Sequence, residues 1–423
     1  MTDPRLAEAD PPDEAGGHPS PDRGAEHPAL AAYRARTRRS MTIYGAVILV
    51  IGLVAFLAVR LAYAHGELDK VSLQTAPAPT SLPTGSIAGT LSSQWQTSDR
   101  AAGGTPYSEG IVVTYSGHTV NGRDARTGAV RWHYTRADEL VCGLVQQDRS
   151  TIAIYQRGKN CDEVTGFVTA TGQPKFYRTL MDNGSLALAS APNVVLAVSD
   201  SAVHVFDNAG GLDRWRWIAP PACTVDRSLA GSKGVLTAYH CGAEYHLSLH
   251  ELTGAKETWS ILVDQPYLPI SAGTVIAAAS TSTGRTITLS AGKGAITAGP
   301  QLGSAAALTS SLRSLPRSQT TVEGSDSSNR SVELVRLGSL YCLNATGKLL
   351  WSGPTESQPT LVGTDFVTGS VGGRVVLYRL NNGQPAQQIS IGDSGVLPGT
   401  TAYEAGTGLL LAGSKTEFYS GRR

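Results

Sequence analysis

Residues 93 to 423 show a short-range alternation of apolar and polar positions. Runs of Val, Ile, Leu, Ala and Tyr are broken by Gly, Asn and Asp at the spacing of hairpins. No window shows the period of about 3.6 residues that is typical of an amphipathic surface helix. The pattern therefore predicts an all-β domain over residues 93–423.

A longer repeat overlies this alternation. Each copy has an apolar strand, a second strand ending in a small or acidic residue, a turn with Gly, and commonly an aromatic residue soon after it. The clearest copies contain Asp124, Gly128 and Trp132, and then Gly347 and Trp351. Weaker copies contain Gly172 with Phe176, Gly211 with Trp215, and Gly254 with Trp259, while Gly292 and Gly383 mark degenerate ones. The glycines recur about every 40 residues, the length of one four-stranded propeller blade.

The repeat has a direct physical interpretation. Its Gly supplies the positive backbone angle of a tight hairpin, and its aromatic residue can pack between neighbouring blades. The widest interval between turn glycines contains the polar stretch from Ser310 to Ser331, which we interpret as a loop inserted into a blade. Residues 395–420 supply about three further strands, and the segment around Trp95 can supply the fourth. We therefore predict eight blades in a closed ring, with seven as the alternative.

The unit from Asp124 to Trp132 resembles the repeat of the PQQ-like β-propellers. This superfamily includes quinoprotein alcohol dehydrogenases and the non-enzymatic outer-membrane assembly lipoprotein BamB. The resemblance covers residues 93–420 and implies a β-propeller. It does not separate enzymes from scaffolds, because the motif is a packing device that both share.

Four of the five cysteines occur in two similarly spaced pairs. Cys142 and Cys161, like Cys223 and Cys241, flank a strand-turn-strand stretch at equivalent places in successive blades. We predict two disulfides within blades, formed in an oxidising compartment, and an unpaired Cys342. The alternative is five buried, reduced thiols.

The first 40 residues predict a disordered cytoplasmic tail. Residues 1–32 are rich in Pro and acidic side chains and almost free of large apolar ones, so they cannot bury enough surface to offset the entropy of ordering. A basic cluster follows, formed by Arg34, Arg36, Arg38 and Arg39.

Residues 41–64 are predicted to form a single membrane-spanning helix. Met41–Val59 carries no charge, and as a helix it would span roughly 28 Å, close to the thickness of the hydrocarbon core. The preceding arginines put the N-terminus in the cytoplasm and the β domain outside the cytoplasmic membrane. The alternative is a long signal peptide cleaved between Ala64 and His65, which follows a small-x-small sequence. Residues 65–92, rich in Pro, Ser and Thr, predict a linker.

One stretch concentrates side chains that can bind metals: His240, Cys241, Glu244, His246 and His250. On a strand, Glu244, His246 and His250 would face the same side. Cys241 is better explained by pairing with Cys223, and no second ligand cluster is visible. We therefore expect a solvated strand face and no metal, with zinc or copper as the alternative.

The net charge and the cysteine pattern argue against two classes of function, nucleic-acid binding and quinoprotein catalysis. With 35 basic and 34 acidic residues the formal net charge is +1, which argues against nucleic acid as a partner. The chain lacks the adjacent cysteines that quinoprotein dehydrogenases typically place beside their quinone, so we expect no catalytic residues and no cofactor. The bias toward Arg over Lys is typical of high-GC coding and suggests an actinobacterial member.

The sequence thus predicts a membrane-anchored, non-enzymatic propeller scaffold. Its propeller would bind a protein or cell-envelope component outside the cytoplasmic membrane through loops on one face of the ring, while residues 41–64 contact the lipid bilayer. The alternatives are a PQQ-dependent or other propeller enzyme, and an extracytoplasmic ligand sensor.

Overall fold

The computed structural model describes residues 44–57, 59, 70–180, 186–326, 328–392, 395–397 and 399–421. The chain divides into two compact parts, residues 1–69 and residues 70–423. The predicted tail over residues 1–40 and the alternative cleavage site at Ala64 and His65 lie outside the described residues.

The N-terminal part contains a helix within the predicted membrane span. Residues 44–57 and 59 are helical, and their large apolar side chains are 48% to 70% exposed. In the part of the chain that the structure describes, no helix is long and apolar enough to cross a membrane. The structure therefore does not support the span predicted over residues 41–64.

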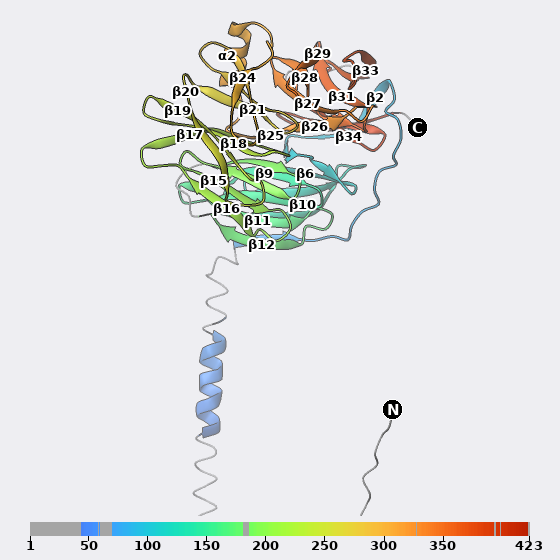
Figure 1. Cartoon of the computed structure of the whole chain (residues 1–423). Coiled ribbons are helices and arrows are strands. Elements are labelled where there is room, and N and C mark those ends of the chain that lie inside the picture. Colours follow the sequence, from blue (N-terminus) through green and yellow to red (C-terminus); the bar gives the residue numbers. More distant parts are fainter. Residues whose placement is uncertain are drawn as a thin grey trace, which may run out of the picture. The chain divides into compact units, whose positions relative to one another are not determined.

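Residues 70–423 are built mainly from β-strands, which confirms the all-β prediction. Their described strands form seven hydrogen-bonded sheets, of which the largest, with eight strands, joins two four-stranded groups edge to edge. Divided at that edge, the strands make eight units, numbered here 1 to 8 in chain order (Figure 1).

Units 1 to 4 occupy the first half of the domain. Unit 1 has β3 (Arg100–Ala101), β5 (Tyr107–Ser108), β6 (Ile111–Ser116), β7 (Thr119–Asp124) and β8 (Val130–Arg136). Unit 2 has β9 (Val141–Gln147), β10 (Ser150–Arg157), β11 (Asn160–Val168) and β12 (Pro174–Thr179). Unit 3 has β13 (Ala187–Ala191), β14 (Val194–Val198), β15 (Ala202–Asp207) and β16 (Asp213–Ile218). Unit 4 has β17 (Cys223–Gly231), β18 (Gly234–Cys241), β19 (Glu244–His250) and β20 (Glu257–Val263).

Units 5 to 8 complete the domain. Unit 5 has β21 (Tyr267–Ala272), β22 (Ile276–Ser280), β23 (Thr286–Leu289) and β24 (Ile296–Ala298). Unit 6 has β26 (Val322–Ser325), β27 (Ser331–Leu337), β28 (Ser339–Asn344) and β29 (Leu349–Pro354). Unit 7 has β30 (Leu361–Val362), β31 (Phe366–Val371), β32 (Arg374–Arg379) and β33 (Pro385–Ile391). Unit 8 has β34 (Thr401–Ala405), β35 (Gly408–Ala412), β36 (Thr416–Ser420) and an early strand, β2 (Thr90–Thr97).

Strand β2 completes the last unit, as predicted for the segment around Trp95. It pairs antiparallel with β36, from Ser92 opposite Ser420 to Thr97 opposite Thr416. Its first residues also pair in parallel with β33, and Figure 1 shows this early strand among the late ones. The early strand β2 and the last strand of the domain, β36, are therefore held together by backbone hydrogen bonds.

The apolar core is divided among neighbouring units. Seven clusters of buried side chains each combine residues from two units that are adjacent in the order 1 to 8. The eighth cluster joins unit 8 to unit 1, with Trp95, Leu410 and Phe418 against Val112 and Ala125. Every described unit thus buries apolar side chains against both neighbours, and the units form a closed, propeller-type ring.

The polar stretch from Ser310 to Ser331 is not the inserted loop that the sequence suggested. It contains the end of helix α2 (Ala305–Arg313), strand β25 (Ser318–Thr320) and the unit 6 strand β26. The helix buries Leu308 and Leu312 in the cluster between units 5 and 6. Strand β25 pairs in parallel with β17 of unit 4, so apolar burial and backbone pairing order a segment that is polar on average.

Part of the predicted linker packs on the ring. Strand β1 (Val71–Gln74) pairs with the last strand of unit 1, β8, with Leu73 opposite Tyr134. Further along, Leu82 and Ile87 are buried, with exposed fractions of 9% and 6%. The structure thus differs from the prediction over residues 70–92, because scattered apolar residues there find partners on units 1, 7 and 8.

Candidate functional site

The tryptophans of the repeat make one recurring contact between units. In unit 1, Nε1 of Trp132 donates to the Thr169 carbonyl of unit 2 at 2.8 Å. Trp215, Trp259 and Trp351 donate in the same way to Leu252, Ala291 and Leu380 of the next unit. In the closing strand, Nε1 of Trp95 donates to the Ala125 carbonyl of unit 1 at 2.9 Å. The aromatic positions hold the units together, as the repeat predicts.

The turn glycines receive these aromatic rings. Gly128 has φ of +71°, and a Cβ built on it would lie 2.7 Å from two ring atoms of Trp95. Gly172, Gly211 and Gly383 likewise have positive φ and pack on Trp132, Phe176 and Trp351. Gly347 has φ of +79° but packs on Thr288 and Val275. Asp124 fixes its turn by accepting hydrogen bonds from the backbone of Arg126 and Thr127.

Two predicted glycines do not have this role. Gly254 does not adopt a positive φ; it stands three residues before the following strand β20, whereas Gly128 stands two residues before β8. For the turn of unit 5 the glycine with positive φ is Gly294, which packs on Trp259, whereas Gly292 has nothing within 4 Å of a built Cβ. In the sequence Gly-Lys-Gly at 292–294, the turn glycine of the repeat is therefore Gly294, and the prediction of Gly292 was wrong.

Both predicted disulfides are present. Cys142 is bonded to Cys161 and Cys223 to Cys241, and each bridge joins strands within one unit. Cys342 is free and buried. Burial raises the pKa of its thiol to about 12, with the carboxyl groups of Asp326 and Glu333 adding to the shift. Its thiol is therefore protonated at neutral pH.

The histidine-rich stretch of unit 4 is occupied by structural contacts. Nδ1 of His240 lies 2.9 Å from Asp226, and Cys241 is in a disulfide. His246 stacks on Tyr239 and lies 3.8 Å from the exposed Glu244. His250 stacks on Trp215, and burial lowers the pKa of its imidazole to about 4. Among the described residues, no group of three or more His, Cys, Asp or Glu side chains can hold a metal ion.

A cavity of about 750 Å³ is the strongest candidate for a binding site. Residues from the first strands, or the loops beside them, of seven of the eight units contribute to its wall, so it lies where these strands converge. Six of the lining residues are Tyr107, Gln147, Gln358, Leu361, Tyr403 and Glu404. Its volume falls within the range of small-molecule and peptide pockets. No residue of this cavity was predicted as a site, because the repeat marks the last strand of each unit and the turn before it, whereas the cavity is lined mainly by first strands.

Two segments from outside the four-stranded units line the cavity by pairing with first strands. Strand β4 (Gly103–Gly104) pairs in parallel with β9, and β25 pairs in parallel with β17. The guanidinium of Arg227 fastens the second segment, since it donates to the carbonyls of Pro269 and Pro316 and to Oε1 of Gln319. Burial lowers the pKa of Arg227 to about 9, so it stays charged at neutral pH.

The electrostatics of the wall are set by carboxyl groups. Glu323 lines the cavity and accepts hydrogen bonds from the backbone and hydroxyl of Ser232, at 2.8 and 2.6 Å. Behind it, Glu333 is fully buried on the neighbouring strand. Burial, together with the charge of Glu323, raises the pKa of Glu333 to about 9. At neutral pH Glu333 is therefore protonated.

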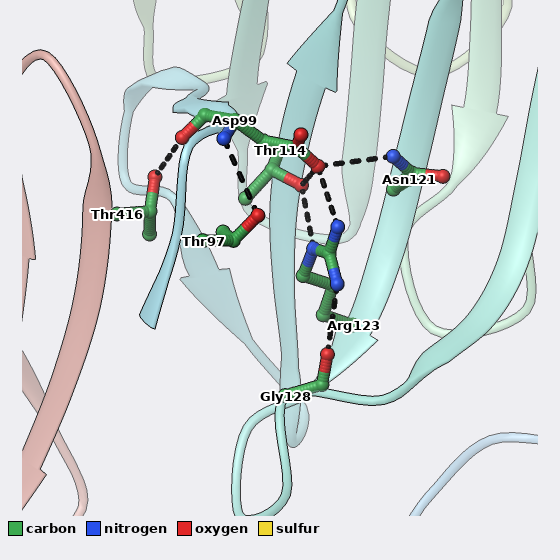
Figure 2. Close-up of polar contacts among 7 residues, drawn as sticks. All are labelled: Thr97, Asp99, Thr114, Asn121, Arg123, Gly128 and Thr416. Carbon is green, nitrogen blue, oxygen red and sulfur yellow. Dashed lines mark hydrogen bonds and ion pairs between the residues drawn. The ribbon is translucent and has the colours of Figure 1, made fainter. Parts of the chain in front are cut away.

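The seam between units 8 and 1 contains a buried polar network that the sequence did not reveal (Figure 2). Oδ2 of Asp99 accepts hydrogen bonds from Thr114, Asn121 and Arg123 at 3.1, 3.1 and 2.6 Å. Its carbonyl accepts one from the Thr416 hydroxyl of unit 8. Burial alone would raise the pKa of Asp99, but the hydrogen bond and charge of Arg123 outweigh it and hold the pKa below its usual value. The network links unit 8 to unit 1 across the seam.

Comparisons with known proteins bear on the fold alone. No family model matches the chain, and no curated protein matches it. Among solved structures, the computationally designed Ika8 protein is 14% identical, covers 79% of this chain and all of its own, and has a TM-score of 0.55. BamB from Moraxella catarrhalis is 13% identical over 78% of this chain and all of its own, with a TM-score of 0.46. Sqt1 from Saccharomyces cerevisiae is 13% identical over 83% of this chain and all of its own, with a TM-score of 0.48.

Of these three, Ika8 is similar enough for the likeness to support the fold. The resemblance to PQQ-like propellers and the actinobacterial source stay predictions from the sequence, because no family model matches.

Proposed function

We propose that this chain is a non-enzymatic scaffold whose propeller binds a protein or cell-envelope component. The proposal places the N-terminus in the cytoplasm, an anchor over residues 41–64 in the cytoplasmic membrane, and the ring outside it. The observation that carries the binding role is the central cavity of about 750 Å³.

Within each unit, the residues that hold neighbouring units together are largely separate from those that line the cavity, and this separation supports the proposal. The aromatic and glycine residues of the repeat are engaged in contacts between units, whereas the cavity wall is formed mainly by first strands and the loops beside them. Leu252, which accepts from Trp215, is the lining residue that also takes part in a repeat contact. Loops on a rigid scaffold are common places for recognition. The wall contains hydroxyl, amide and backbone groups with Tyr107 and Tyr403, a composition suited to a protein surface or an extended segment.

Two observations support the proposed location. The described helix exposes a continuous set of large apolar side chains, including Ile48, Leu49 and Ile51, which water solvates poorly. The two disulfides within units 2 and 4 are typical of proteins folded in an oxidising compartment outside the cytoplasm.

Affinity purification of the full-length tagged protein, solubilised from its own membrane in mild detergent after brief crosslinking in cells, tests the proposal. The control is the anchor alone, residues 1–69, which lacks the ring. We expect a near-stoichiometric partner with the full chain and none with the control. A full chain that is recovered alone after crosslinking would contradict the scaffold role and favour the enzyme and sensor alternatives.

A further inference from the structure

The central cavity is negatively charged. Glu323 and Glu404 are the two charged residues among the described residues that line it, and no Lys, Arg or His side chain is part of its wall. Both are partly exposed to solvent. A concave site with one sign of charge raises the local concentration of ligands of opposite charge. The wall therefore favours cationic groups over neutral or anionic ones.

Backbone and hydroxyl groups hold the two carboxylates in place. The amide and hydroxyl of Ser232 orient Glu323, and Oε2 of Glu404 accepts from the amide of Gly363 at 3.0 Å. These donors are neutral, so each carboxylate keeps its net charge for a ligand. Gly273 lets Glu323 and the protonated Glu333 pack together, since a built Cβ would lie 2.4 Å from Oε1 of Glu323 and 2.5 Å from Oε2 of Glu333.

The inner side of the ring already accepts added strands. Two segments of this chain, β4 and β25, pair in parallel with the first strands of units 2 and 4. The first strands of units 6, 7 and 8 are β26, β30 and β34, and each ends its sheet with no strand beyond it among the described ones. Such an edge presents backbone N–H and C=O groups that an extended peptide can pair with. On β34 the carbonyl of Ala402 already accepts from the hydroxyls of Thr360 and Thr368. The charged residues Glu323 and Glu404 lie on β26 and β34.

We infer that the partner enters the central cavity as an extended segment carrying Lys or Arg. The segment pairs through its backbone with an open edge of unit 6, 7 or 8, in the manner of β4 and β25, and its cationic side chains meet Glu323 and Glu404. The inference rests on the proposed scaffold function and specifies the chemistry of the partner at the same site.

A display library of random heptapeptides, selected on the full-length protein in detergent, tests this inference without knowledge of the partner. The test variant is Glu323→Gln with Glu404→Gln. The matched control is Glu244→Gln with Glu257→Gln, which changes the net charge equally. Both residues are exposed, lie on the third and fourth strands of unit 4 and are not part of the cavity wall. Thermal unfolding checks that each variant is folded, and Glu404→Gln alone replaces the double variant if that does not fold.

We expect selected peptides to be enriched in Lys and Arg. Synthetic copies should bind the double variant about tenfold or more weakly than the control variant, measured by fluorescence anisotropy, because a partly desolvated charge pair contributes on the order of a factor of ten. Binding should also weaken as salt rises. Failure to select any peptide, enrichment of acidic or neutral peptides, or equal affinity for both variants would overturn the inference.

The two proposals fail in different ways. If the cellular partner is recovered equally with the wild-type chain and with the Glu323→Gln, Glu404→Gln variant, the charge inference is wrong and the scaffold function stands. If the wild-type chain recovers no partner, the scaffold function itself is wrong.

Discussion

Closure of the ring by β2 predicts a specific energetic coupling between Trp95 and Gly128. The indole is 9% exposed, donates to the Ala125 carbonyl and packs directly on Gly128. Replacing it with Ala should cost about 3–5 kcal/mol of unfolding free energy, the usual range for a buried Trp or Phe. Trp95→Phe keeps most of the packing and loses the hydrogen bond, so it should cost about 1 kcal/mol for the bond.

Gly128→Ala should destabilise for two separable reasons. A residue other than Gly at φ of +71° costs about 1–2 kcal/mol of backbone strain. The added methyl also lies 2.7 Å from the Trp95 ring, and such overpacking costs about 1–3 kcal/mol. Gly117 is the matched control, because it has φ of +56° with nothing within 4 Å of a built Cβ. Gly117→Ala therefore reports backbone strain alone.

Denaturant unfolding of the full-length variants, followed by circular dichroism, measures the coupling as a double-mutant cycle. In the Trp95→Ala background most of the overpacking is absent, so Gly128→Ala should cost about 1–3 kcal/mol less than it does in the wild type. Gly117→Ala should cost the same in both backgrounds. If the effects of Trp95→Ala and Gly128→Ala are additive, β2 does not close the ring as described.

Three further outcomes follow from buried groups and crosslinks. Arg227→Met leaves the carbonyls of Pro269 and Pro316 without their donor, at about 1–3 kcal/mol for each buried group, and trypsin should then cleave after Arg317 faster than in the wild type. Unchanged cleavage would show that Arg227 does not fasten β25. Replacing both Cys223 and Cys241 with Ser should cost about 3 kcal/mol, from the closure of a loop with sequence separation of 18, and a loss below about 1 kcal/mol would contradict this. Because the pKa of Glu333 rises from 4.5 to about 9 on folding, the folded state keeps a proton that the unfolded chain releases, and stability falls as pH rises between these values. Glu333→Gln should therefore reduce the drop in melting temperature between pH 5 and pH 8, and an unchanged drop would refute the assignment.

The features that the sequence predicted well are those with a local, repeated signature. The last hairpin of a unit can be predicted from Asp124, Gly128 and Trp132, because turn geometry and packing between units both depend on them. The cysteine pairs could be assigned because their sequence separations are nearly equal, 19 and 18. The expectation that they lie in successive blades was wrong, since they lie in units 2 and 4. The contribution of Trp95 to the last unit followed from counting strands.

The features that were missed depend on contacts distant in sequence. No sequence pattern marks Asp99, because its role depends on Arg123 and on Thr416, which is 317 residues away. Strand β25 lies in a polar stretch, and its order comes from β17 and Arg227. The cavity could not be predicted because its wall draws short groups of residues, without a motif, from many units that are distant in sequence.

Site-specific photo-crosslinking in cells tests the central claim, that the ring binds a partner in its central cavity. A photoreactive amino acid at Gln358, which is partly buried in the cavity wall, should give a crosslinked partner. The same amino acid at Leu262, which is 62% exposed on the last strand of unit 4, should give none. A partner captured equally from both positions, or from Leu262 alone, would contradict the account.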